Sequence, residues 1–137
     1  MTVSRFAAGL YIYGALSALV SVSLAALASH GLAGLAPAGE QAVEWFRIAT
    51  DFQMNHALGL ILVTAISEHL SPGHARTMMR MAAGFLAAGA LLFPAALYSL
   101  SFLGPSFFAP FGGVAAMVGW ALFAVAGLST LRRQAKE

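Results

Sequence analysis

Four long stretches of the sequence are dominated by apolar residues, and each is long enough to cross a membrane. They cover about 6–28, 45–66, 81–103 and 111–131, and all but the second are free of formal charge. A helix of roughly 20 apolar residues spans a hydrocarbon core of about 30 Å, and a helix satisfies its own backbone hydrogen bonds where lipid offers none. With 60% hydrophobic and 9% charged residues, the chain lacks the surface of a water-soluble domain. The sequence predicts an all-α polytopic membrane protein: one domain over 1–137, an antiparallel bundle of four transmembrane helices.

Charge and cysteine content exclude several classes of partner and chemistry. The formal net charge of +2 is too small for a nucleic-acid-binding surface. The absence of cysteine excludes a disulfide, a thiolate nucleophile and a cysteine-ligated metal. The first apolar stretch follows Arg5 and ends in Ala26-Leu27-Ala28, like a secretory signal. It is longer than the roughly 7–15 apolar residues of a signal, so we expect a first membrane span.

The distribution of basic residues predicts the orientation. Positively charged residues stay on the cytoplasmic side during insertion. With four spans, both termini and the middle loop share one side, and the segments 31–44 and 104–110 lie on the other side without a basic residue. We therefore expect both termini in the cytoplasm or in a mitochondrial matrix. The Ala- and Arg-rich, Lys-poor composition favours a bacterium, with the chain in its inner membrane. The shared side carries Arg5, Arg76, Arg80, Arg132, Arg133 and Lys136.

Small residues at helical spacing predict where the helices approach one another, since membrane helices pack closely through such residues. The same surfaces could instead dock against another protein. Pro94, in the third span, is expected to kink its helix or free a carbonyl for the polar layer of the second span. The small residues concerned are Ser17, Ser21, Ala25 and Ser29, then Gly84 with Ala88, and Gly112 with Ala116. An aromatic belt at the outer ends is predicted from Trp45, Phe107, Phe108 and Phe111.

The second span holds the polar residues that could carry chemistry. Arg47, Asp51 and Asn55 follow an i, i+4, i+8 spacing with Glu44 on nearly the same face, and Gln53 and His56 share another face. Polar groups at this depth persist when they are paired, face the bundle interior or line water.

Two interpretations remain open for this layer. In the structural one, Arg47 pairs with Asp51 while the amides and His56 bond to neighbouring helices, where Tyr98, Ser99, Ser101 and His30 are available. In the functional one, a cavity open to the outside binds a small molecule, a lipid head group, a quinone or a proton. Its candidate ligand-binding residues are His30, Arg47, Asp51, Gln53, Asn55, His56 and Tyr98.

Other chemistries have weaker support. His30, His56 and Asp51 could be metal ligands, but no two histidines share one helical turn, so neither a metal nor another cofactor is predicted. His69 and His74, in a polar loop with Glu68, are expected to be solvated. Asp51 and His56 point about 140° apart around one helix and could not cooperate as acid and base. We therefore expect no enzymatic activity.

Three motifs give the chain a family resemblance. They are Ala28-Ser29-His30-Gly31-Leu32, then Gln53-Met54-Asn55-His56-Ala57-Leu58, then Pro110-Phe111-Gly112-Gly113 with Gly119-Trp120. In this order and spacing, the chain resembles the YgdD-like family of small integral membrane proteins from about Gly14 to Gly127. The resemblance implies His30, Gln53 and His56 as recurring polar residues and supports the topology, but it assigns no reaction. The stretch Phe93–Tyr98 departs from the Ser/Gly-rich pattern of that family.

Two functions follow from these observations. The first is a non-catalytic accessory or structural subunit, or an assembly partner, of a larger membrane complex. Small size and short loops favour it, and the partners would be the lipid bilayer, other integral membrane subunits or further copies of the chain. The alternative is binding of a small molecule, lipid or quinone, or minor transport, through the polar layer in the outer half of the second span.

Overall fold

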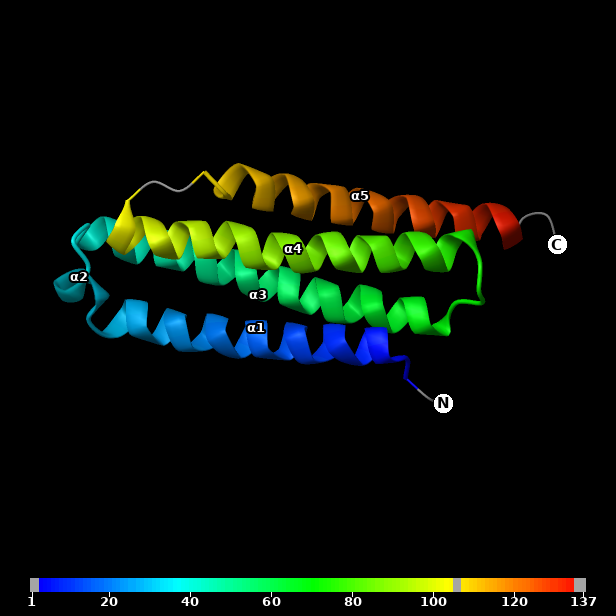
Figure 1. Ribbon diagram of the computed structural model, residues 1–137, viewed down its shortest axis with the longest axis horizontal. Helices are drawn as coiled ribbons and strands as arrows, with labels where there is room; N and C mark the ends of the chain where they lie inside the picture. The colour runs from blue at the N-terminus through cyan, green and yellow to red at the C-terminus, as the bar shows by residue number, and fades with distance from the viewer. Residues whose placement is uncertain (1–2, 105–106, 135–137) are drawn as a thin grey trace.

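The computed structural model contains five helices, four of them long and antiparallel (Figure 1). It describes residues 3–104 and 107–134, with side chains up to residue 130. Each predicted span falls inside one long helix, which confirms the all-helical prediction. Pro105 and the side chains of Arg132, Arg133 and Lys136 lie outside the described residues. The helices are α1 (Arg5–His30), α2 (Leu32–Leu35), α3 (Glu40–His69), α4 (His74–Leu103) and α5 (Ala109–Gln134).

The helix ends follow from local chemistry. Ser4 caps α1, where its hydroxyl oxygen accepts a hydrogen bond from the backbone N–H of Ala7 at 3.2 Å. Gly39 and Gly104 flank α3 and α4 with φ angles of 56° and 90°, a region that side chains disfavour and glycine allows. The turn between α3 and α4 is short, since α3 ends at His69 and α4 begins at His74. The connection between α1 and α3 contains the single turn of helix α2.

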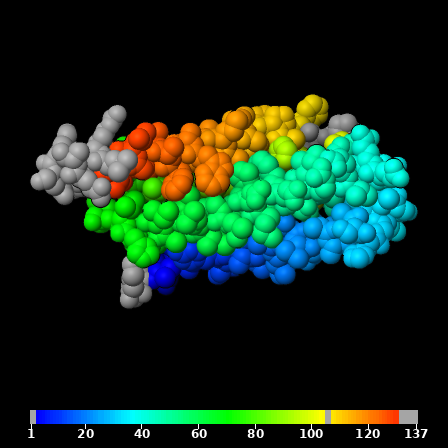
Figure 2. Space-filling model, turned by 180° about the vertical axis from the view of Figure 1, so that it is seen from behind, coloured from blue at the N-terminus to red at the C-terminus, as the bar shows by residue number. Residues whose placement is uncertain are grey.

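The long helices form an open layer. α1 packs on α3, α3 on α4 and α4 on α5, while α1 contacts α4 only slightly. In the described part of the chain, α1 and α5 lie on opposite sides of the α3–α4 pair (Figure 1). Seen from behind, α3 runs along the middle of one broad face between α1 and α5 (Figure 2). One side of α3 is therefore free of neighbouring helices.

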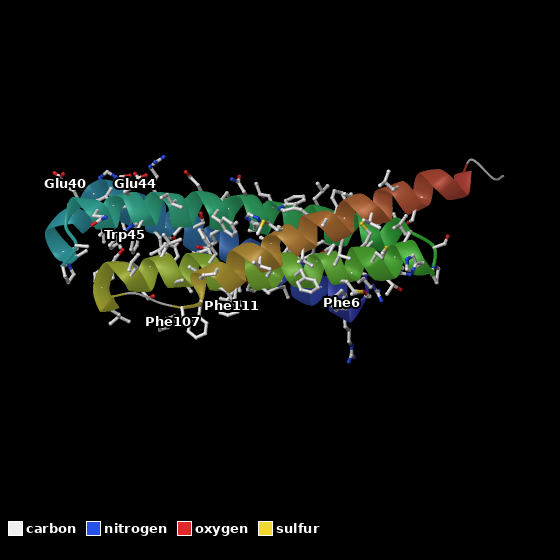
Figure 3. All side chains as sticks on the ribbon, turned by 90° about the horizontal axis from the view of Figure 1, so that it is seen from above. Phe6, Glu40, Glu44, Trp45, Phe107 and Phe111 are labelled. Atoms are coloured by element: carbon white, nitrogen blue, oxygen red, sulfur yellow. The ribbon has the colours of Figure 1, made fainter. Side chains whose placement is uncertain are left out.

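Within residues 3–104 and 107–134, three helices are long and apolar enough to cross a membrane: α1, α4 and residues 109–130 of α5. α3 is longer than any predicted span, at 30 residues or about 45 Å, but the polar residues of its first half lower its hydropathy. Trp45, Phe107 and Phe111 lie toward the end of the molecule that carries Glu44, and Phe6 lies toward the other end (Figure 3). Trp45, Phe107 and Phe111 thus share one end of the molecule, and the aromatic belt stays a prediction.

Two pairs of small residues were predicted to let α4 and α5 pack closely. The pair on α5 does so, and Gly84 on α4 does not. A methyl group on Gly112 would overlap the backbone nitrogen of Phe93, and one on Gly89 would lie 2.9 Å from the Cβ of Ala116. The prediction for Gly112 and Ala116 is confirmed. Gly84 is exposed with nothing near it, so its predicted packing role is wrong, because it points out of the layer.

The predicted stripe of small residues on α1 is confirmed only in its first half. Ser17 and Ser21 are buried against α3, and the Ser21 hydroxyl donates a 2.9 Å hydrogen bond to the carbonyl of Thr50. Ser29 is exposed and bonds to the carbonyl of Ala25 in its own helix. Ser17 and Ser21 are therefore the members of the stripe that bring α1 onto α3.

Candidate functional site

Gln53 is the centre of a polar contact among three helices. Its side chain is 7% exposed. The Nε2 of Gln53 donates a hydrogen bond to Ser17 Oγ of α1 at 3.2 Å, and its Oε1 accepts one from the Tyr98 hydroxyl of α4 at 2.8 Å. A buried amide is stable when its donor and acceptor are both used. The structural interpretation is thus realised at Gln53, with Tyr98 as the predicted partner.

The other predicted partners on α4 do not join this contact. Ser99 and Ser101 donate to the carbonyls of Ala96 and Leu97 in their own helix. Gln53 uses two side chains instead of a carbonyl freed by Pro94, and α4 continues through Pro94 as one helix. The predicted roles of Ser99 and Ser101 were wrong, because hydroxyl groups on a helix readily bond to the preceding turn. The kink at Pro94 stays a prediction.

His56 belongs to an aromatic cluster, apart from Gln53. It is half-buried, and its Nδ1 lies 2.7 Å from the carbonyl oxygen of Phe52. A carbonyl only accepts, so Nδ1 carries the proton and Nε2 is left as an acceptor in the neutral ring. The ring stacks on Phe52 with a centroid distance of 3.9 Å and meets the edge of Trp120 at 6.2 Å. His56 therefore faces α5, whereas Gln53 faces α1 and α4.

Arg47, Asp51 and Asn55 are all exposed on the free side of α3. Arg47 donates from Nε and Nη2 to the Glu44 carboxylate, at 3.0 and 2.6 Å. The predicted Arg47–Asp51 pair is wrong, because Glu44 lies one turn before Arg47 and captures the guanidinium. Among the described residues, Asp51 and Asn55 form no hydrogen bond through their side chains.

His30 does not join the polar layer. It is exposed in the last turn of α1, about 20 Å along that helix from Ser17, which lies level with Gln53. Within the ranges that the structure describes, no group of three or more histidine, aspartate or glutamate side chains could hold a metal ion. The seven candidate residues are thus divided among four places: the Gln53–Tyr98 contact, the aromatic cluster at His56, the outward face of α3 and the end of α1.

An ionic cluster at the opposite end of the molecule was not foreseen. Glu68 accepts hydrogen bonds from Arg80 at 3.1 Å, Arg76 at 3.2 Å and the backbone N–H of Ser4 at 3.1 Å. The hydrogen bond from Arg80, followed by that from Ser4, lowers the pKa of Glu68 to about 2. Glu68 is therefore not a solvated loop residue: it lies in α3 and joins α1 to α4. His69 and His74 beside it are exposed, as predicted.

The signal for this cluster was available in the sequence. Ser71-Pro72-Gly73 predicts a tight turn, and a tight turn places the last residues of one helix beside the first residues of the next. The carboxylate of Glu68 therefore had to lie near Arg76.

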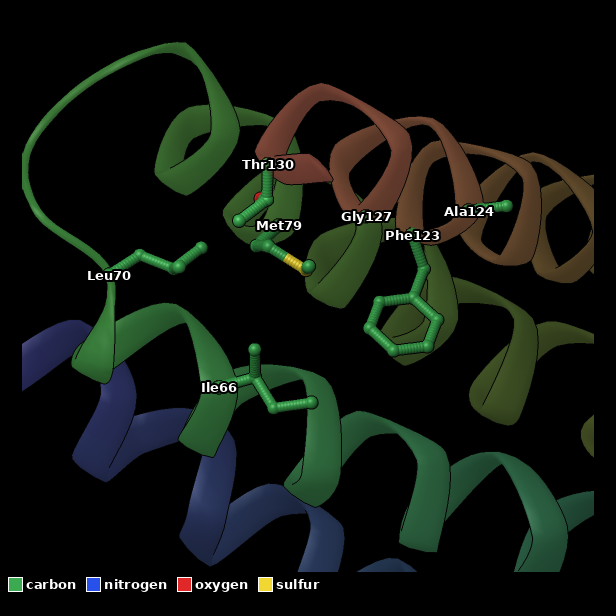
Figure 4. Close-up of a pocket in the computed structure, with 7 residues that line it drawn as sticks. All are labelled: Ile66, Leu70, Met79, Phe123, Ala124, Gly127 and Thr130. Atoms are coloured by element: carbon green, nitrogen blue, oxygen red, sulfur yellow. The ribbon is translucent and has the colours of Figure 1, made fainter. Parts of the chain in front are cut away.

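Several cavities open on the surface of the described part of the chain, including two between long helices. A groove of about 180 Å³ between α1 and α4 has Val20, Leu24, Ala95 and Tyr98 in its walls and reaches Gln53. A larger apolar pocket, about 520 Å³, lies between the ends of α3 and α5 and is lined by Ile66, Leu70, Met79, Phe123, Ala124, Gly127 and Thr130 (Figure 4). The groove has two of the candidate residues, Gln53 and Tyr98, in its lining.

Comparisons with known proteins show which family the chain belongs to. Residues 24–113 match the family described as "Protein of unknown function (DUF423)". The UPF0382 membrane protein YwdK of Bacillus subtilis is 36% identical over 88% of this chain and 96% of its own length. The UPF0382 inner membrane protein YgdD of Escherichia coli is 30% identical over 95% of each chain. The chain belongs to this family.

Membership in the DUF423 family confirms the predicted resemblance and the predicted membrane location. The matched segment contains all seven candidate residues, from His30 to Tyr98. The family description names no activity. No solved structure matches the chain.

Proposed function

We propose that this DUF423 protein spans a bacterial inner membrane four times, with both termini in the cytoplasm, and that it is a non-catalytic subunit. In this proposal it acts by packing against another membrane-embedded helix through the outer half of α3. The observation that carries the proposal is the exposure of Asp51 and Asn55 on the free side of α3. The printed name of YgdD, an inner membrane protein, supports the location.

The depth of these side chains makes their exposure informative. An ionic cluster suits the cytoplasmic boundary of the hydrocarbon core, and Glu68, Arg76 and Arg80 form such a cluster. A hydrocarbon core of about 30 Å measured from Glu68 along α3 ends near Ile48. Asp51 and Asn55 then lie inside the hydrocarbon, and Arg47 lies at its outer boundary.

Lipid is a poor environment for this face. Insertion of an aspartate costs about 2.5–3.5 kcal/mol at the centre of a membrane helix and less toward the boundary, where Asp51 lies. Intramembrane polar groups usually face a protein interior, and Asn55 lies deeper than Asp51. Another helix that supplied hydrogen-bond partners would remove this cost. Asp51 and His56 lie on different sides of α3, which supports a non-catalytic role.

Photo-cross-linking in intact membranes tests the proposal. Leu58, the next exposed residue after Asn55 on this face, and Leu16 on α1 are each 55% exposed, so they form a matched pair. A photoreactive residue at position 58 should give a protein adduct, while one at position 16 should react only with lipid. Lipid adducts alone at both positions would contradict the proposal.

A second function is favoured by the groove between α1 and α4. Its walls are apolar and it ends at Gln53 and Tyr98, so it suits a slender lipid-soluble molecule with one hydrogen-bonding group. Ala95→Phe should fill the groove and remove any co-purifying lipid or quinone detected by native mass spectrometry. Ala121→Phe, at an exposed position on α5, is the control. Equal ligand content in both variants would exclude the groove.

A further inference from the structure

The exposed residues of α3 follow a coiled-coil repeat. Seven exposed residues lie on one side of α3 with a spacing that alternates between three and four: Gln41, Glu44, Ile48, Asp51, Asn55, Leu58 and Leu62. This set, the α3 face, has the mean period of 3.5 residues along which two helices wind around each other. Arg47 is exposed beside this set. A face that only met lipid would need no polar residue in this pattern.

The chemistry of the α3 face is complementary to itself. Arg47 uses Nε and Nη2 for Glu44, and its Nη1 has no hydrogen bond within the described part of the chain. Asp51, one turn farther along α3, lacks a donor. Asn55 offers both a donor and an acceptor, so two asparagine amides can satisfy each other.

Membrane insertion fixes how two copies can meet. Identical chains insert in the same orientation, so a two-fold axis normal to the membrane places equivalent residues at equal depth. Asn55 then meets Asn55 of the second copy. Asp51 likewise meets Asp51 of the second copy, and the repulsion between these two carboxylates is offset by Arg47, which lies one helical turn away on each copy. A single asparagine in such a contact is also a known means of fixing register.

Access to the α3 face is unobstructed. α3 lies along the middle of the broad face in Figure 2, and its Leu58 and Leu62 are 55% and 53% exposed. The buried Gln53 contact faces the opposite direction, toward α1 and α4. A second copy could therefore pack on α3 with no change in the fold.

We propose that the occupant of the α3 face is a second copy of this chain, paired in parallel through α3. The Asn55 amides bond to each other, and Arg47 of each copy bonds to Asp51 of the other. This inference rests on the proposed function, in which the α3 face is covered by a helix, and it names that helix.

Cysteine cross-linking in membranes tests the pairing, since the chain contains no cysteine. Leu58→Cys should form a disulfide-linked dimer on oxidation, and the matched variant Leu16→Cys should not. Adding Asn55→Leu to Leu58→Cys should weaken dimerisation by about threefold for each hydrogen bond lost, whereas Asn55→Gln should retain most of it. The thermal stability of each variant in a detergent that dissociates the dimer should equal that of the unsubstituted chain, because residue 55 makes no contact with the Gln53 site.

The outcomes separate the two proposals. Equal dimer yields from Leu58→Cys and Leu16→Cys would mean random collision and would overturn the pairing. A photo-adduct at position 58 with the mass of a different protein, without a dimer, would overturn the pairing and leave the proposed function standing. Absence of any protein adduct at position 58 would overturn both.

Discussion

Gly112→Ala should destabilise the fold, while Gly113→Ala at the next position should not. At Gly112 the added methyl group would overlap the backbone nitrogen of Phe93 and lie 2.8 Å from its Cα. Backbone atoms cannot rotate away, so α5 must move off α4. At Gly113 the nearest atom to the methyl group is Phe93 Cδ2 at 4.0 Å, an ordinary contact.

The added methyl group has two opposite effects on the free energy of unfolding. Overpacking a close contact costs about 1–3 kcal/mol, whereas alanine in place of glycine within a helix gains up to about 1 kcal/mol. The helix-propensity gain applies to both variants, since both glycines lie in α5, so the two should differ by the overpacking cost, about 1–3 kcal/mol in free energy of unfolding. Thermal unfolding in detergent micelles measures this difference, with Gly113→Ala as the internal control. Equal stability of the two variants would refute the close approach of α4 and α5 at Phe93.

Three further predictions concern the polar contacts and the topology. Tyr98→Phe removes the hydrogen bond to Gln53 and should lower stability in the same assay by about 0.6–1.7 kcal/mol; Tyr11→Phe, at a position without a hydrogen bond in the described residues, should change nothing. The pKa of Glu68 is lowered to about 2, so its contribution to stability is complete above its ordinary pKa of about 4.3 and is lost as the pH falls toward 2. Thermal unfolding between pH 5 and 2 should therefore show a steeper loss in the unsubstituted chain than in Glu68→Gln, and parallel curves would contradict the role of the Arg80 contact. Compartment-specific reporters fused at residues 1 and 137 should both be cytoplasmic, and opposite locations would exclude four spans.

The extent of the helices was harder to predict than their existence. Apolar runs identify the part of a helix that suits lipid, but a helix continues into the aqueous boundary with polar residues. Glu40 and His69 begin and end α3, several residues beyond the predicted span at each end. Hydropathy contains no information on that extension, because polar residues are equally compatible with a loop.

Depth along a span was predictable, whereas direction around it was not. Gln53 and Tyr98 were expected at similar depth, and they bond to each other. The choice of Glu44 over Asp51 by Arg47 depends on a side-chain rotamer, since both carboxylates are within reach on one helix face. Whether that face turns inward or outward depends on where α1, α4 and α5 pack, and these contacts are long-range.

The two polar sides of α3 differ in how they are stabilised, and this difference assigns them different roles. On the inner side, the Gln53 amide oxygen and nitrogen both have partners within the fold, so its removal costs stability whether or not it also binds a ligand. On the outer side, Asp51 and Asn55 form no hydrogen bond among the described residues, so the fold of one chain gains nothing from them there. Groups that raise the cost of insertion without stabilising the monomer are explained by a contact outside it. If α3 acts as proposed, substitutions on the α3 face separate function from folding, and substitutions at Gln53 do not.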